Sequence, residues 1–162
     1  MKKDWSIGLM TGTVNDGNID IAAIRTDGEK IIEFGPYELF PYENKKIRQL
    51  VFETYEAAKN WNFQGPEPKI FLTVEKLITI EQSEAVNKFI GKYNFHRESI
   101  FSIGFHGQTI LHRPPNNIIK LGKTRQLGDG NMMSNYLKLP VVFDFRSNDI
   151  ANGGQGAPLA PI

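Results

Sequence analysis

A polar segment rich in glycine and threonine separates two apolar runs near the beginning of the chain. It reads TGTVNDGN and covers residues 11–18. Gly12 and Gly17 allow backbone conformations in which neighbouring N–H groups converge on an anion, and the threonines add hydroxyl donors. Asp16 or Asp20 could hold a water molecule on Mg²⁺, which accepts few protein ligands. The segment therefore suits a phosphate group, but a plain hairpin turn with Asn-Asp-Gly chemistry explains the same residues.

A second polar segment, GFHGQT, ends an apolar stretch and contains His106 and Gln108. Polar residues at the carboxyl end of a strand often line the cleft of an open α/β sheet. His106 is therefore a candidate for binding a polar substrate or for transferring a proton. The alternative is a structural histidine that hydrogen bonds to the backbone at the end of the strand. His96 and His112 lie in loop-like contexts and receive no role.

The third segment, VVFDFRSNDIANGGQGAP, carries two carboxylates. Asp144 closes an apolar run, and Asp149 comes shortly before the glycines at 153–156. A carboxylate beside a flexible glycine run is well placed to meet a substrate hydroxyl. Arg146 could pair with one carboxylate and lower its pKa, or bind an anion on the substrate. The alternative is a structural turn in which Arg146 and Asp149 form an ion pair.

The three segments have one thing in common, because each lies at the end of a predicted strand. A phosphate cradle, a polar tip and a strand-end carboxylate are the parts of a phosphotransferase. The carboxylate takes a proton from the attacking hydroxyl or water, while a metal ion and N–H donors hold the phosphates in line. The sequence therefore predicts that the tip of the first hairpin and the turn at 144–149 lie at the same edge of one sheet.

The elements that must position these segments begin with three strands. Apolar runs predict strands at 5–10 and 19–25. The Asp-Gly pair at 27–28 predicts a hairpin turn into a third strand at 30–42. Gly35-Pro36 interrupts that third run, so an irregular strand is expected there.

Helices and further strands follow. Apolar residues at helical spacing predict helices at 44–61 and 69–93. This order predicts an α/β domain, a ribonuclease-H-like (actin-like ATPase) lobe with a mixed sheet, in which parallel strands with crossover helices follow three antiparallel N-terminal strands. The later elements are a strand at 99–109, a short strand at 124–128, a helix at 129–137 with Asp129 as N-cap, and a strand at 139–145.

The composition is that of a globular chain, since 40% of its 162 residues are hydrophobic and 23% are charged. The net charge of +1 suggests neither nucleic acid nor an anionic membrane as a partner. The absence of cysteine excludes disulfides and thiolate metal sites and is compatible with the cytosol. No signal peptide or apolar run of transmembrane length occurs. Because the final segment ANGGQGAPLAPI contains no closing strand or helix, we expect a chain cut before a further part.

Four segments carry a resemblance to a known family: GLMTGTVNDGNID, GFHGQTILHRP, QLGD and PVVFDFRSNDIANGGQGAPLAP. In order and spacing they resemble the anhydro-N-acetylmuramic acid kinases, which belong with sugar kinases, actin and Hsp70-type ATPases. The match runs through most of the chain, and the helices at 44–93 contribute least to it. The first segment departs from the commoner family form, which has a serine and an apolar residue near Val14 and Asn15, and Asn18 is an extra residue relative to that form.

The resemblance implies an enzyme that uses ATP and Mg²⁺ to phosphorylate the 6-hydroxyl of 1,6-anhydro-N-acetylmuramic acid while water opens the anhydro ring. The product would be N-acetylmuramic acid 6-phosphate, in cytoplasmic peptidoglycan recycling. Asp149 matches the base aspartate that precedes small residues in related sugar kinases, and Asp144 is its support or the second candidate. His106, Gln108 and Arg146 would bind the sugar, and no residue is assigned as a direct metal ligand. The segment facing ATP would comprise Gly12, Thr13, Val14, Asn15, Asp16, Gly17, Asn18 and Asp20.

Members of this family are roughly twice as long, so 1–162 would be the N-terminal lobe of a two-lobed kinase. The missing C-terminal lobe would hold a second phosphate loop and the adenosine site. We therefore expect the isolated chain to bind ATP poorly and to turn over slowly or not at all. The family also implies a homodimer. The alternatives are a non-catalytic sugar- or partner-binding remnant of the same fold and, less specifically, an actin-like ATPase with another substrate.

Overall fold

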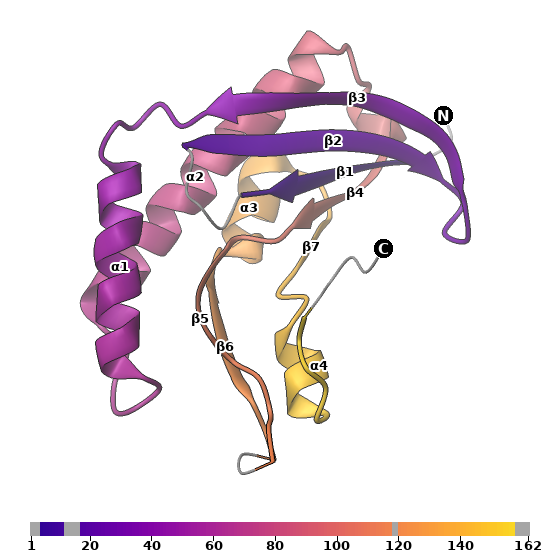
Figure 1. Cartoon of the computed structure of the whole chain (residues 1–162). Helices are drawn as coiled ribbons and strands as arrows, with labels where there is room; N and C mark the ends of the chain where they lie inside the picture. Colours follow the sequence, from indigo (N-terminus) through magenta and orange to yellow (C-terminus); the bar gives the residue numbers. More distant parts are fainter. Residues whose placement is uncertain (1–3, 12–16, 118–119, 158–162) are drawn as a thin grey trace.

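The computed structural model describes residues 4–11, 17–117 and 120–157 (Figure 1). A five-stranded sheet forms the centre of the molecule, and a separate pair of strands extends away from it. The elements in chain order are β1 (Trp5–Met10), β2 (Asn18–Thr26), β3 (Ile31–Pro41), α1 (Ile47–Trp61), α2 (Lys69–Lys92), the 3₁₀ turn η1 (Arg97–Ser99), β4 (Ile100–Phe105), β5 (Gln108–Arg113), β6 (Lys123–Leu127), α3 (Gly130–Leu137), β7 (Val141–Phe143) and α4 (Ser147–Ala151).

The main sheet has the strand order β3-β2-β1-β4-β7. β2 pairs antiparallel with both β1 and β3, whereas β4 lies parallel to β1 and β7 lies parallel to β4. The helices α1 and α2 connect β3 to β4, and α3 leads into β7. The predicted mixed α/β architecture, with three antiparallel strands before the parallel ones, is confirmed. The ribonuclease-H-like class stays a prediction.

Alternation along the strands turns one face of the sheet into the core. In β1, Ile7 and Leu9 are buried, whereas Met10 on the other face is exposed. The helices α2 and α3 lie behind the sheet in Figure 1. The side chains of α2 that are fully buried in this core are Phe71, Val74, Ile78, Val86 and Phe89.

The helices begin and end close to the predicted positions. α1 starts three residues later than expected because Asn44 forms a turn, in which its carbonyl accepts from the backbone N–H of Ile47 at 3.0 Å. The predicted N-cap of α3 is confirmed, since the Asp129 carboxylate accepts from the backbone N–H of Met132 at 2.8 Å. Within the described ranges, no helix combines the length and the apolar character needed to cross a membrane.

The predicted strand at 99–109 is wrong in one respect, because the structure divides it at His106-Gly107. β4 ends at Phe105, and β5 begins at Gln108 and pairs antiparallel with β6 in a second, two-stranded sheet. Gly107 has φ +66°, and a Cβ there would lie 2.2 Å from the Leu127 carbonyl oxygen. The break therefore depends on a glycine that approaches the backbone of β6 more closely than any side chain allows.

Two further segments differ from the prediction. β3 runs without a gap through Gly35-Pro36, and the expected irregularity appears as a register shift against β2 between Ala22 and Ile24. A Cβ on Gly35 would lie 2.6 Å from the Trp5 ring, so this position has no room for a side chain. The segment after Asp144, expected to be a turn, contains the short helix α4.

Candidate functional site

Three of the chemically interesting segments meet at one edge of the main sheet. β1, β4 and β7 are parallel neighbours, with Leu9 opposite Phe105 and Phe105 opposite Phe143. Their carboxyl ends therefore share an edge, where an open α/β sheet usually forms its binding crevice. The Thr11 hydroxyl donates to the Gly107 carbonyl at 3.0 Å, joining the segment after β1 to the segment after β4. The described flank of the first hairpin at Thr11 therefore lies at the same edge as the turn at 144–149, whereas the tip itself, for which the shared edge was predicted, lies outside the described residues.

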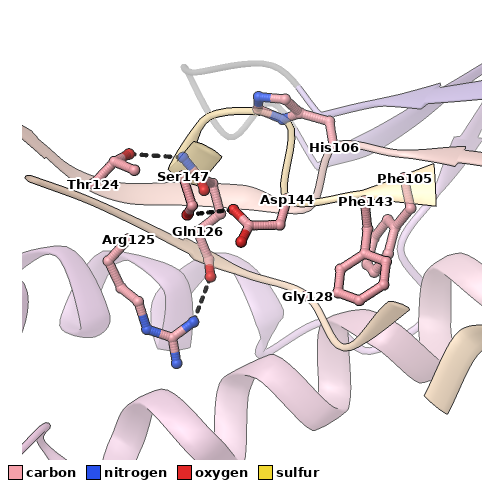
Figure 2. Close-up of a pocket in the computed structure, with 9 residues that line it drawn as sticks. All are labelled: Phe105, His106, Thr124, Arg125, Gln126, Gly128, Phe143, Asp144 and Ser147. Atoms are coloured by element: carbon pink, nitrogen blue, oxygen red, sulfur yellow. Dashed lines mark hydrogen bonds between the residues drawn. The ribbon is translucent and has the colours of Figure 1, made fainter. Parts of the chain in front are cut away.

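A pocket of about 270 Å³ opens between this edge and the β5–β6 pair (Figure 2). Its lining residues include aromatic rings together with hydroxyl, amide, imidazole and carboxylate groups, a mixture that suits a small polar ligand. The residues that line it are Phe105, His106, Thr124, Arg125, Gln126, Gly128, Phe143, Asp144 and Ser147.

Asp144 lies directly after β7 and lines the pocket. Its backbone has φ +55°, a left-handed conformation that aspartate adopts more readily than most residues. The carboxylate accepts from the Ser147 hydroxyl at 2.5 Å, at the first residue of α4. The left-handed turn therefore directs the chain from β7 into α4 and leaves an exposed carboxylate at the pocket wall.

His106 lines the same pocket and uses both of its ring nitrogens. Nδ1 lies 2.9 Å from the Gly107 carbonyl oxygen, and Nε2 lies 3.0 Å from Nη2 of Arg146. Burial lowers the pKa of His106, and the nearby Arg146 cation lowers it further, while the contact with the Gly107 carbonyl raises it by a smaller amount than burial lowers it. The imidazole is therefore neutral at neutral pH.

Arg146 contacts neither of the two aspartates through its guanidinium group. Nη1 donates to the Gly156 carbonyl and Nη2 donates to His106, while Nε is buried without a partner among the described residues. Burial lowers the pKa of Arg146. The Asp149 carboxylate instead accepts from the backbone N–H of Gly156 at 2.7 Å. The Arg146–Asp149 ion pair that the sequence allows is therefore not formed.

Gln108 lies away from the pocket lining. Its side chain is buried, and Nε2 donates to the Tyr55 hydroxyl of α1 at 2.6 Å. Burial raises the pKa of Tyr55, and the hydrogen bond from Gln108 partly offsets that rise. In this arrangement Gln108 joins β5 to α1, and its predicted role in substrate binding stays a prediction.

The structure also brings residues to the pocket that the sequence prediction missed. Thr124 and Gln126 alternate along β6, so their side chains share one face, and Gln126 Nε2 donates to the Thr124 hydroxyl at 2.8 Å. Ser147 was missed because α4 was not predicted. The run of polar residues in TRQ was the available signal, but only the pairing of β6 with β5 shows which cavity Thr124 and Gln126 face.

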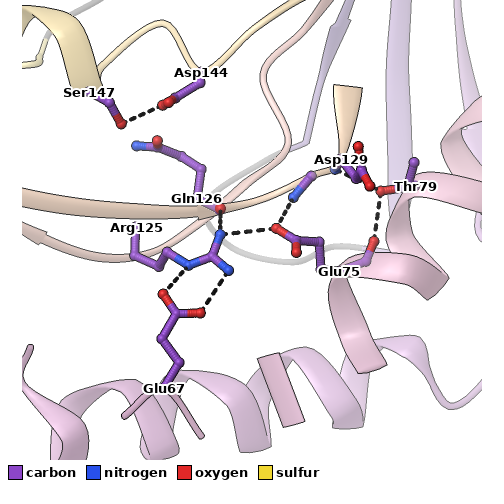
Figure 3. Close-up of polar contacts among 9 residues, drawn as sticks. Glu67, Glu75, Thr79, Arg125, Gln126, Asp129, Asp144 and Ser147 are labelled. Carbon is purple, nitrogen blue, oxygen red and sulfur yellow. Dashed lines mark hydrogen bonds and ion pairs between the residues drawn. The ribbon is translucent and has the colours of Figure 1, made fainter. Parts of the chain in front are cut away.

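A polar network fixes the wall formed by β6 (Figure 3). Arg125 donates to both Glu67 oxygens at 2.8 and 2.9 Å and to Glu75 at 2.9 Å. Burial lowers the pKa of Arg125, but its bonds to the two carboxylates outweigh burial and raise it overall. Glu75 also accepts from the backbone N–H of Gly128 at 3.1 Å, and Thr79 accepts from that of Asp129 at 3.0 Å. The link from β6 to α3 is thereby held against α2.

The predicted nucleotide-binding segment is described only at its flanks. Gly12, Thr13, Val14, Asn15 and Asp16 lie outside the described residues, whereas Gly17, Asn18 and Asp20 lie within them. Gly17 has φ +92° and its carbonyl accepts from the backbone N–H of Tyr42 at 2.9 Å. Asp20 pairs with Met10 and Leu39 across the sheet. The described ranges contain no cluster of three or more His, Cys, Asp or Glu side chains that could cage a metal ion.

The comparisons with known proteins agree with one another. A family model described as anhydro-N-acetylmuramic acid kinase matches residues 4–162. Relatives of that name from Mesorhizobium japonicum and Rhizobium rhizogenes are each 54% identical to the chain over 160 residues, covering 99% of this chain and 43% of the relative. Anhydro-N-acetylmuramic acid kinase 2 of Jannaschia sp. is 50% identical over 158 residues, covering 98% of this chain and 41% of its own. The chain therefore spans less than half the length of the curated relatives it matches.

One solved structure resembles the chain weakly. The structure described as a reductive activator for corrinoid,iron-sulfur protein aligns with a TM-score of 0.43 and 8% sequence identity, over 66% of this chain and 15% of its own. A likeness of this size does not define the fold.

Proposed function

Because the chain belongs to the anhydro-N-acetylmuramic acid kinase family, we propose that the pocket at its sheet edge binds the anhydro amino sugar that this kinase phosphorylates. The reaction combines transfer of a phosphoryl group to the sugar 6-hydroxyl with cleavage of the 1,6-anhydro bond by water. Bound ATP would supply the phosphoryl group. The same proposal extends to a cytoplasmic role in peptidoglycan recycling.

The pocket residues suit a sugar ring. Thr124, Gln126 and Ser147 present hydroxyl and amide groups that can hydrogen bond to sugar hydroxyls. The Phe143 ring is exposed beside the buried ring of Phe105 at one end of the pocket, where it offers an apolar surface to the carbon face of a sugar (Figure 2). The observation that carries the proposal is this convergence on a sugar-sized cavity at the carboxyl ends of parallel strands.

We propose Asp149 as the base that activates the water, with Asp144 as the second candidate. The Asp149 carboxylate is oriented by the backbone N–H of Gly156, which donates to one of its two oxygens. Asp144 lies in the pocket lining itself and is fixed by Ser147. Both groups are exposed carboxylates, so each can accept a proton.

The nucleotide is proposed to lie along the first hairpin, from Gly12 to Asp20. Mg²⁺ in phosphoryl-transfer sites is usually held by one or two carboxylates, waters and the phosphates themselves. Asp16 or Asp20 would orient a water of that ion, which fits the partly exposed carboxylate of Asp20 at the beginning of β2. The remaining contacts to ATP would come from a second lobe, as the greater length of the relatives suggests.

The assignment of the base is tested in the complete gene product that carries residues 1–162. D149N should reduce kcat by about 10²–10⁴-fold and leave the affinity for the anhydro sugar, measured by calorimetry without ATP, almost unchanged. D144N should lower both sugar affinity and turnover. E56Q is the control, because Glu56 is an exposed carboxylate of α1 paired with Lys59. Near-normal kcat in D149N, with loss in D144N, would move the base to Asp144.

A further inference from the structure

A continuous set of hydrogen bonds links the end of β1 to the Asp149 carboxylate. The Gly107 carbonyl accepts from the Thr11 hydroxyl at 3.0 Å and lies 2.9 Å from His106 Nδ1. His106 Nε2 lies 3.0 Å from Arg146, and Arg146 donates to the Gly156 carbonyl. The Gly156 N–H then donates to Asp149 at 2.7 Å. The set therefore joins the segments after β1, β4 and β7.

The partners of His106 determine its tautomer. A carbonyl oxygen only accepts, so Nδ1 must carry the proton that is donated to Gly107. A guanidinium group only donates, so Nε2 must be unprotonated toward Arg146. Both ring nitrogens are occupied, and neither is available for proton transfer to a substrate. The structure therefore favours a structural use of this histidine over the catalytic one that the sequence left open.

Arg146 is a cation without an anionic partner. Its two hydrogen-bond acceptors, His106 and the Gly156 carbonyl, are neutral, and no carboxylate in the described part of the chain forms an ion pair with it. A partly desolvated guanidinium group without an ion pair is costly, and Nε is buried without any acceptor in that part of the chain. The arrangement contributes to geometry instead. The planar guanidinium group bonds the His106 ring and the Gly156 carbonyl at the same time, so it fixes the separation of the segments that carry them.

The segment that Arg146 holds packs closely on the Asp149 carboxylate. Gly156 has φ +64°, and a Cβ there would lie 2.8 Å from Ile150 and 3.2 Å from the His112 ring. A Cβ on Gly154 would lie 2.2 Å from an oxygen of Asp149. The glycine run is therefore in contact with the carboxylate, and a shift of Gly156 must shift the oxygen to which it donates.

We infer that His106 and Arg146 are positioning residues. They hold Gly156, and through it the Asp149 carboxylate, at a fixed position relative to the segment that follows β1. The inference rests on the proposed function, in which Asp149 is the base. Displacing a base by about 1 Å can lower the rate on the order of 10²-fold, so a small displacement of the Asp149 carboxylate should give a measurable loss of kcat.

The test uses the complete gene product and compares H106A with H106Q. The Gln side chain offers an amide oxygen as an acceptor for Arg146, whereas Ala offers none. H106A should lower kcat by about 10–100-fold with a much smaller change in KM for the sugar, and H106Q should recover most of the loss. R146A should lower kcat similarly, and H106A/R146A should be no worse than either single variant. H96Q is the control, because His96 is exposed and its side chain has no hydrogen bond among those described.

The pH profile separates positioning from a general loss of structure. The ionisable groups around the His106 ring are Arg146, with His112 beside it, and Arg125 and Asp144 in the pocket. Protonation of His106 removes its acceptor for Arg146, so wild-type kcat should fall at acid pH. H106Q cannot be protonated and should keep its rate to lower pH. Additive losses in the double variant, or H106Q as inactive as H106A, would overturn the inference. Normal kcat in D149N would overturn the assignment of Asp149 as the base, whatever the kinetics of the His106 variants.

Discussion

At the scale of single residues, hydrogen-bond partners decide which polar side chains serve the pocket. His106 and Gln108 are separated by one residue in the sequence and were both predicted to bind the substrate. In the structure His106 lines the pocket, whereas Gln108 is buried against Tyr55. The intervening Gly107 turns the chain from the main sheet into the β5–β6 pair, so the two side chains enter different surroundings.

The Gln108–Tyr55 contact leads to a prediction about stability. Y55F leaves the buried Gln108 amide without its acceptor, and it should lower the free energy of unfolding by about 1–3 kcal/mol. Replacing both partners by apolar groups, in Y55F/Q108L, should recover most of that loss because no unsatisfied donor remains. Urea denaturation followed by circular dichroism measures both effects. Unchanged stability in Y55F, together with weaker sugar binding in Q108L, would instead support the predicted contact between Gln108 and the substrate.

At the scale of elements, the break between β4 and β5 creates the pocket. Had the chain continued as one strand from 99 to 109, as the apolar pattern predicts, β5 and β6 would not face the turn after β7. The network of Arg125 with Glu67 and Glu75 then holds β6 against α2 (Figure 3). The pocket is thus formed between two sheets that diverge at Gly107.

Gly107 is therefore expected to be the most sensitive glycine of this region. G107A adds a Cβ 2.2 Å from the Leu127 carbonyl and strains a backbone with φ +66°, so it should destabilise the fold by about 2–4 kcal/mol. G8A is the matched control, because a Cβ on Gly8 of β1 meets no atom within 4 Å. Thermal and urea unfolding of both variants measure the difference. Equal stability of the two variants would show that β5 can leave the sheet edge without this glycine.

At the scale of the whole molecule, the described residues present a core on one sheet face and an apolar surface on the other. Met10, Tyr37 and Leu39 are exposed around a hollow of about 400 Å³ over β1, β2 and β3. Apolar surface of this kind often marks an interface with another domain or protein. The relatives, of which this chain covers 43%, contain further sequence that could supply such a partner.

The proposed division of a kinase into two lobes makes a prediction for the isolated chain. Residues 1–162 should bind ATP poorly, because the adenosine site and the second phosphate loop are expected in the other lobe. Titration calorimetry of the purified chain with ATP and Mg²⁺ measures this directly. A titration with the anhydro sugar is the matched comparison, since the proposed sugar pocket lies within the described residues. An ATP affinity in the micromolar range would contradict the prediction.

The sequence by itself determined the local elements of this protein. Apolar runs predicted the strands at 5–10 and 19–25, helical spacing predicted α1 and α2, and Asp129 identified the start of α3. These features depend on neighbours within a few residues, whose spacing the sequence states directly. The motif segments likewise indicated the family, which the family model confirms.

Only the tertiary structure decided how the polar groups are paired. His106 meets Arg146 across 40 positions and Gln108 meets Tyr55 across 53, and neither pairing is visible in local spacing. The position of the strand break depends on the close approach of Gly107 to Leu127, which exists only once β5 lies beside β6. The hydrogen-bond capacity of each side chain belongs to the sequence, but the partner that satisfies it is selected by which distant segments the folded backbone brings within about 3 Å.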